Sequence, residues 1–93
     1  MILGVFKISG HSMIPYLKPN EQVLVSSIPY VFSKPKIGDV VLFKNDRKTF
    51  IKRVVKISND KIKVEGDNKS DSLNVLPIMR RDIIAKVILL LHS

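Results

Sequence analysis

Short apolar runs, most of them rich in Val, Ile and Phe, are separated by polar turns along this chain. β-Branched and aromatic side chains favour a pleated, half-buried strand. No window of a dozen residues shows the 3.6-residue apolar repeat of an amphipathic helix. The pattern therefore predicts five or six short strands, within residues 5–8, 22–25, 39–43, 49–57, 61–64 and 83–91.

Turn-forming residues lie between these runs. Ser58-Asn59-Asp60 separates two strand-like segments and predicts a hairpin that pairs residues 54–57 with residues 61–64. Consecutive strands joined by such short turns pair antiparallel. The predicted fold class is therefore mainly β: a compact, antiparallel β-fold resembling a partly open barrel.

Two regions fall outside the strand pattern. Residues 26–36 contain Pro29 and Pro35 and are expected to form an excursion between two strands. Helical structure is expected at most as a single turn, near residues 13–18 or 77–81.

Length and composition limit the possible function classes. A chain of 93 residues supplies one hydrophobic core, so residues 1–93 are expected to form a single domain. A hydrophobic fraction of 45% with 26% charged residues is typical of a globular protein. The absence of cysteine excludes disulfides, zinc–thiolate sites and a cysteine nucleophile. We expect no metal site and no cofactor.

Sixteen Lys and Arg residues against eight Asp and Glu residues give a net charge of +8, which favours anionic partners. The apolar start of the chain is too short for a secretory signal, and residues 83–91 are too few for a membrane-spanning helix of about 20 residues. We therefore expect neither a signal peptide nor a membrane span. The location is left open between the membrane periphery and the cytoplasm.

The first candidate for chemistry is Ser12, in a serine-rich segment directly after a predicted strand. Gly10 allows a sharp turn and a close approach of a ligand to the backbone, so Ser12 could be presented beside amide N–H groups. The alternative is a turn whose serines satisfy their own backbone. His11 is a poor base for Ser12, because adjacent residues in an extended segment point apart, and His92 is penultimate in the chain.

Lysine can replace histidine as the base when burial disfavours the ammonium form and lowers the pKa. Lys52 fits best, because alternation along its strand places it on one face with Phe50 and Val54. The opposite face then carries Ile51, Arg53, Val55 and Ile57. The alternative is a solvated lysine whose stem packs while its amine stays in water.

Four segments, in order along the chain, resemble the boxes of type I signal peptidases. They are residues 9–17 with Ser12-Met13, residues 37–43 with Gly38-Asp39, residues 51–55 with Lys52-Arg53, and residues 66–72 with Gly66-Asp67-Asn68. The wider group of Ser-Lys peptidases, including self-cleaving LexA-like domains, is similar in the serine and lysine boxes. The resemblance implies a minimal catalytic core of a serine endopeptidase that removes a leader, signal or propeptide.

Carried over by position, the resemblance makes Ser12 the nucleophile and Lys52 the general base. The backbone N–H of Ser12 would be one oxyanion donor, and Gly10 would keep the approach to it open. The turn at residues 66–68 would return the chain to the site. Ser70, or else Ser72, would hydrogen-bond the lysine amine.

The substrate implied by the resemblance is a protein or peptide bound as an extended strand, with small side chains in shallow apolar pockets. Ile8, Met13 and Ile14 would line those pockets, and core packing explains these residues equally well. Weak association with an anionic membrane is possible through the apolar end of the chain and its basic surface, although residues 83–91 are better explained as a core strand. No nucleic acid is expected as a partner.

Two positions depart from the family pattern. Tyr16 stands where the family usually has threonine, and Leu73 stands where an arginine usually supports the last box. A catalytically impaired homologue is therefore one alternative. A small basic β-barrel that binds nucleic acid is another, although the aromatic residues are not interleaved with the basic ones. A self-cleaving regulator is disfavoured. Such proteins carry a scissile pair of small residues on an N-terminal segment, whereas the only alanine of this chain is Ala85.

Overall fold

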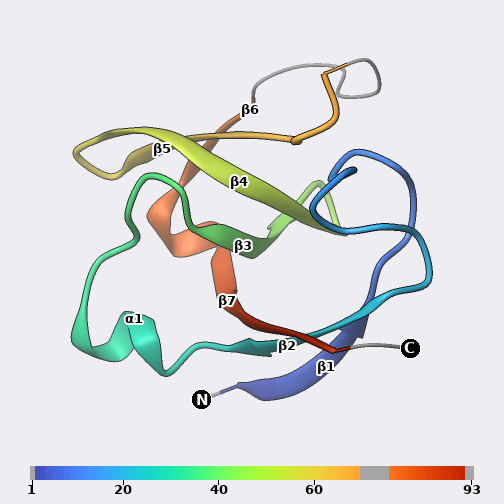
Figure 1. Ribbon diagram of the computed structural model, residues 1–93. Coiled ribbons are helices and arrows are strands. Elements are labelled where there is room, and N and C mark those ends of the chain that lie inside the picture. Colours follow the sequence, from blue (N-terminus) through green and yellow to red (C-terminus); the bar gives the residue numbers. More distant parts are fainter. Residues whose placement is uncertain (1, 70–75, 92–93) are drawn as a thin grey trace.

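The computed structural model describes residues 2–69 and 76–91. Within these residues the chain forms seven strands, a short helix and one 3-10 turn (Figure 1). The strands are β1 (Leu3–Lys7), β2 (Gln22–Ser26), β3 (Val40–Asn45), β4 (Lys48–Ser58), β5 (Lys61–Glu65), β6 (Leu76–Met79) and β7 (Ile83–Leu91). The helix is α1 (Pro29–Phe32), and the 3-10 turn is η1 (Arg80–Asp82). Neither helical element is long and apolar enough to cross a membrane.

All seven strands belong to one open, antiparallel sheet in the order β1-β2-β7-β3-β4-β5-β6. β1 and β6 are therefore its edges. Figure 1 shows that the sheet is strongly curved, with β1 and β2 at one side of the molecule and β4 and β5 at the other. This arrangement confirms the predicted mainly β, antiparallel fold class.

Six of the strands coincide with the runs identified from the sequence, and β6 is an addition. β6 contains Pro77, which cannot donate to a ladder and is tolerated at a sheet edge. β6 is such an edge strand, and Pro77 is opposite Lys63 of β5, its neighbour in the sheet. The helical turn expected at residues 77–81 is wrong for Pro77–Met79, and η1 begins only at Arg80.

The predicted β4–β5 hairpin is confirmed. Ser58 pairs with Lys61, which leaves Asn59 and Asp60 as a two-residue turn. Asn59 adopts a φ of 56°, a left-handed conformation that asparagine tolerates better than most residues. The local turn chemistry therefore sets the register of this hairpin.

β3 is buried on both faces and separates two apolar clusters. Val40 and Leu42 face the first cluster, whereas Val41 and Phe43 face the second. The first cluster is completed by Ile8, Met13, Leu17, Val23, Val25, Ile51, Ala85 and Val87, and the second by Val54, Ile62, Val64 and Ile78. The curvature of the sheet lets one chain of this size enclose apolar side chains on both sides.

The predicted faces of β4 hold at one end and fail at the other. Ile57 was expected on the face opposite Val54, but both residues pack in the second cluster. The reason is an irregularity in the β4–β5 register between Val54 and Lys56. A bulge of one residue reverses the alternation beyond it.

The excursion between β2 and β3 carries α1 and is attached to the sheet through Asp39. Its carboxylate accepts hydrogen bonds from the Tyr30 hydroxyl at 2.7 Å and from the backbone N–H of Lys36 at 3.0 Å, both at Oδ2. Lys86 of β7 lies 3.5 Å from Oδ1. Burial, together with the hydrogen bond to Asp39 and its negative charge, raises the pKa of the Tyr30 phenol.

Candidate active site

The serine-bearing segment follows β1 directly and is anchored by buried apolar side chains. Gly10 adopts a φ of 82°, which turns the chain after the strand. The backbone N–H of Leu17 donates to the carbonyl oxygen of Met13 at 2.9 Å, and both side chains are buried. The single turn expected at residues 13–18 is therefore present, and it carries Ser12 at its start.

The polar groups of Ser12 are not used to close this turn. The side chain is partly buried, and within residues 2–69 and 76–91 its hydroxyl makes no hydrogen bond. The same holds for its backbone N–H in this part of the chain. A serine that only satisfied its own turn would use at least one of these groups. Both groups are available to a ligand.

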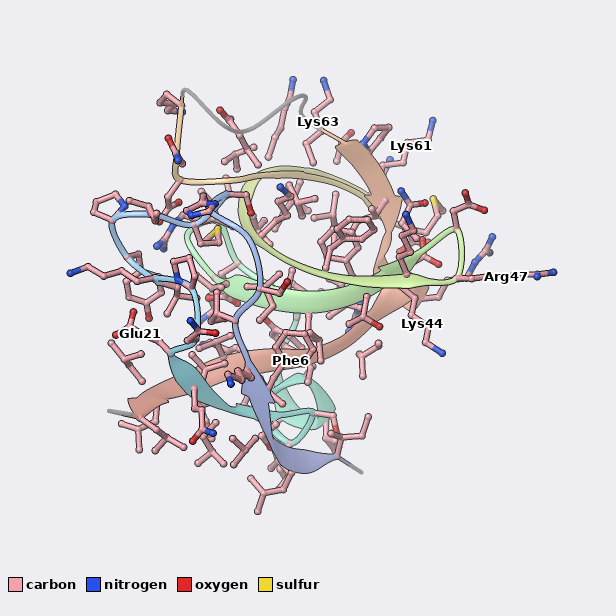
Figure 2. The ribbon with its side chains drawn as sticks, turned by 90° about the vertical axis from the view of Figure 1, so that its right-hand side faces the viewer. Phe6, Glu21, Lys44, Arg47, Lys61 and Lys63 are labelled. Carbon is pink, nitrogen blue, oxygen red and sulfur yellow. The ribbon has the colours of Figure 1, made fainter. Side chains whose placement is uncertain are left out.

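A cleft of about 210 Å³ joins the serine segment to the beginning of β4. Its walls come from two stretches far apart in the sequence, and they are Phe6, Ile8, Ser9, Gly10, Ser12 and Met13 on one side and Thr49, Phe50 and Ile51 on the other. Figure 2 shows Phe6 on the side of β1 that faces the rest of the molecule. The cleft is thus lined by apolar side chains together with the hydroxyl residues Ser9, Ser12 and Thr49.

The three candidate pocket residues differ in their surroundings. Ile8 and Met13 line the cleft and also belong to the first core cluster. Ile14 is partly buried and is not among the residues that line the cleft. Ile8 and Met13 therefore line the cleft and also pack in the core.

Lys52 lies in β4 directly after the stretch that lines the cleft. It pairs with Val41 of β3, so the two side chains share a face of the sheet. Val54 lies on the same face, and both valines are fully buried. The Lys52 side chain is partly buried. The lysine therefore leaves the sheet among apolar neighbours, as its position in the strand predicts.

Two carboxylates, Asp67 and Asp39, each form an ion pair with a basic side chain. Asp67 receives Arg53 through two hydrogen bonds, Nε to Oδ1 and Nη2 to Oδ2, both at 2.8 Å. These hydrogen bonds raise the pKa of the Arg53 guanidinium. Asp39 is the partner of Lys86. Asp71 lies outside the described residues.

The turn at residues 66–68 contacts the serine segment, as expected. The backbone N–H of Asn68 donates to the carbonyl oxygen of Ser12 at 2.8 Å. Its side-chain Nδ2 donates to the carbonyl oxygen of His11 at 2.9 Å. These bonds fix the peptide groups on both sides of Ser12.

Several parts of the site could not be assigned from the sequence. Phe6, Thr49 and Phe50 line the cleft without having been singled out as site residues, although Phe6 is two residues from Ile8 and so shares its face of β1. Ser70 and Ser72, the candidates for orienting the lysine amine, lie outside the described residues, as does Leu73. Across the described ranges, no three His, Asp or Glu side chains gather as they do around a metal ion.

The basic side chains do not converge on the cleft. Figure 2 shows Lys44, Arg47, Lys61 and Lys63 extending away from the sheet, and all four are exposed. They belong to the β3–β4 hairpin and to β5. Much of the positive charge is therefore carried on a solvated surface away from the serine.

Comparison with known proteins connects this arrangement to characterised enzymes. The family model described as "Signal peptidase, peptidase S26" matches residues 1–76. Signal peptidase IB of Staphylococcus aureus (strain Mu50) is 38% identical over 69 residues, covering 71% of this chain and 35% of the relative. Signal peptidase I of Leptolyngbya laminosa is 30% identical over 69 residues, covering 63% of this chain and 34% of the relative. The chain thus spans about a third of the length of these relatives.

Proposed function

Because this chain belongs to the signal peptidase family, peptidase S26, we propose that it is a serine endopeptidase that removes a leader, signal or propeptide from a protein substrate. Ser12 is the nucleophile and Lys52 is the general base in this proposal. The observation that carries it is the cleft lined by Ser12 and by residues 49–51 of β4. Lys52 follows these residues directly in the strand.

The proposed reaction has two steps. In the first step the Ser12 hydroxyl oxygen attacks the scissile carbonyl carbon, and its proton passes to the neutral amine of Lys52. The resulting oxyanion accepts a hydrogen bond from the backbone N–H of Ser12. When the tetrahedral intermediate collapses, the C–N bond breaks, and the departing amine takes the proton from Lys52. The N-terminal part of the substrate is then held as an ester on Ser12.

In the second step water replaces the amine. Lys52 takes a proton from the water, whose oxygen attacks the ester carbonyl carbon. Collapse of this second intermediate breaks the bond to the Ser12 oxygen, which recovers its proton from Lys52. The products are two peptides, and the enzyme returns to its starting state.

The surroundings of Lys52 support its role as the base. Burial among apolar groups disfavours the ammonium form, and only the neutral amine can accept a proton. Val41 and Val54 supply such surroundings on the same face of the sheet.

The lining of the cleft supports a substrate with apolar side chains bound in an extended form. Phe6, Ile8 and Met13 make one wall of this cleft of about 210 Å³ apolar. β1 is an edge strand, so an extended peptide can pair with its unoccupied backbone side. We expect cleavage next to small residues.

A weak association with anionic membranes is part of the proposal. Leu3 and Val5 of β1 and Leu89 of β7 are exposed, and the register places Val5 in line with Leu89 across Leu24 of β2. An exposed apolar face on a chain of net charge +8 suits an anionic lipid surface. Co-sedimentation with phosphatidylserine vesicles should show binding that weakens at high salt. Equal recovery with and without vesicles would contradict it.

The catalytic proposal is tested by incubating the protein with a library of signal peptides in detergent and mapping the cuts by mass spectrometry. Ser12→Ala and Lys52→Arg should each lose cleavage by at least about a hundredfold, since the nucleophile or the proton acceptor is gone. Ser58→Ala and Lys56→Arg provide matched controls at exposed positions in β4. Cleavage that persists in Ser12→Ala would exclude the proposed nucleophile.

A further inference from the structure

Arg53, the neighbour of Lys52 in β4, makes contacts with three separate loops. Its guanidinium holds the Asp67 carboxylate through two hydrogen bonds of 2.8 Å. Its Nη1 donates to the carbonyl oxygen of Gly38 at 2.7 Å. The remaining contact is with the Tyr16 ring, whose centroid lies 5.0 Å from the guanidinium carbon. A guanidinium at this distance over an aromatic face is attracted by the ring.

Tyr16 belongs to the serine segment, four residues after Ser12. Its side chain is 42% exposed, so burial explains little of its placement. Its neighbour Leu17 is fully buried and anchors this end of the segment in the first core cluster. The ring is therefore held at the surface of the molecule beside Arg53.

These contacts connect the serine segment to the turn at residues 66–68 by two routes. The serine segment is attached to the turn at residues 66–68 directly, through the hydrogen bonds from Asn68 to the carbonyl oxygens of Ser12 and His11. It is attached a second time through Tyr16, Arg53 and Asp67. The second attachment lies four residues from the first and adds to the anchoring of the segment by buried Met13 and Leu17.

We propose that Tyr16 is a positioning residue for Ser12, and that its ring restrains the serine segment by packing on the Arg53 guanidinium that holds Asp67. This inference rests on the proposed function, because it assigns Tyr16 a role in presenting the nucleophile. The ring face carries the contact, so phenylalanine should replace tyrosine while leucine should not.

The test uses the full chain with Tyr16→Leu, Tyr16→Phe and, as a matched control, Phe32→Leu. Phe32 is 84% exposed on α1 and takes no part in the contacts among Tyr16, Arg53 and Asp67. The first measurement is the hydrogen exchange rate of the Asn68 backbone amide, which donates to Ser12 and reports opening of the segment without requiring activity. The second is kcat and KM on a cleaved leader peptide.

We expect the Asn68 amide of Tyr16→Leu to exchange about two- to fivefold faster, with kcat reduced by a similar factor and KM unchanged. Tyr16→Phe and Phe32→Leu should match the unmodified protein in both measurements. Unchanged exchange in Tyr16→Leu would show that the restraint does not exist. Faster exchange with unchanged kcat would remove the positioning role, and a Tyr16→Phe variant as impaired as Tyr16→Leu would overturn the role of the ring face.

The two measurements separate this inference from the proposed function. If the unmodified protein cleaves no leader peptide, the proposed peptidase function fails. The Asn68 exchange rate still decides whether Tyr16 restrains the serine segment.

Discussion

The backbone N–H of Asn68 donates a hydrogen bond of 2.8 Å to the carbonyl oxygen of Ser12. The bond joins the turn after β5 to the loop after β1, although β1 is one edge of the sheet order and β5 is next to the other edge. Asn68 adds a side-chain bond to the carbonyl oxygen of His11. The position of the proposed nucleophile therefore depends on a turn far away in the sequence.

Replacing Asn68 with alanine should weaken this attachment without removing it. The backbone bond to Ser12 remains possible, but the bond to His11 is lost, which costs about 1 kcal/mol of unfolding free energy. Urea denaturation measures this change, and cleavage of a leader peptide should fall about three- to tenfold. Lys69→Ala, at an exposed neighbouring position, is the control and should leave both unchanged. An Asn68→Ala variant with normal stability and activity would contradict the prediction.

Asp67→Asn should destabilise the protein more than a comparable change nearby. Asp67 and Arg53 are partly buried, with side chains 19% and 31% exposed, so removal of the charge leaves the guanidinium poorly compensated. We expect a loss of about 1–3 kcal/mol. Glu65→Gln disrupts the exposed pair with Lys69 and should change stability by less than about 0.5 kcal/mol. Equal effects of the two substitutions in urea denaturation would show that the Arg53–Asp67 pair contributes no more to the unfolding free energy than the exposed Glu65–Lys69 pair.

The proposed base predicts the direction of the pH dependence. Activity should rise with pH and reach a plateau as the Lys52 amine loses its proton. Lys52→Arg keeps the charge but cannot accept a proton, so it should be inactive across the whole range. A kcat/KM profile of the unmodified protein, with Lys56→Arg as the control, measures both. Activity that falls with rising pH would exclude a neutral lysine as the base.

The Tyr30 phenol should make stability decrease at high pH. Its pKa is raised in the folded state, so above about pH 10 the unfolded chain releases a proton that the folded protein retains. The unfolding free energy then falls with a slope that approaches about −1.4 kcal/mol per pH unit. Tyr30→Phe lacks this contribution, so its stability deficit against the unmodified protein should narrow by about 1 kcal/mol between pH 10 and pH 11. A deficit that stays constant over this range in urea denaturation would refute the linkage.

Gly10 should resist substitution because of its backbone conformation. An added Cβ would meet no atom within 4 Å, but the φ of +82° is strained for a residue with a side chain. Gly10→Ala should therefore cost about 1–2 kcal/mol. Gly4 also has open space around it and lacks the positive φ, so Gly4→Ala should leave stability unchanged or slightly raised. Thermal or urea denaturation of the pair separates backbone strain from steric conflict, and equal stability of the two variants would exclude strain at Gly10.

Six strands and the β4–β5 hairpin could be located from the sequence alone. Their signals are local: β-branched runs, alternation with a period of two, and turn residues such as Asn59. The candidate residues of the site could also be chosen from their immediate neighbours in the sequence. Ser12 follows a strand, and Lys52 lies between Phe50 and Val54 on one face of its strand. Ser70 and Ser72 remain predictions.

Tertiary structure decided the relationships between distant segments. The bulge between Val54 and Lys56 moved Ile57 to the other face, and the edge position of β6 allowed a strand that contains proline. The pairing of Tyr16 with Arg53 follows from the curvature and order of the sheet. Alternation specifies which side chains share a face, but strand order, register and bulges determine which faces meet. For this reason the sequence could identify the candidate groups, and only the folded sheet could show that Ser12 and residues 49–51 line one cleft, with Lys52 outside its lining.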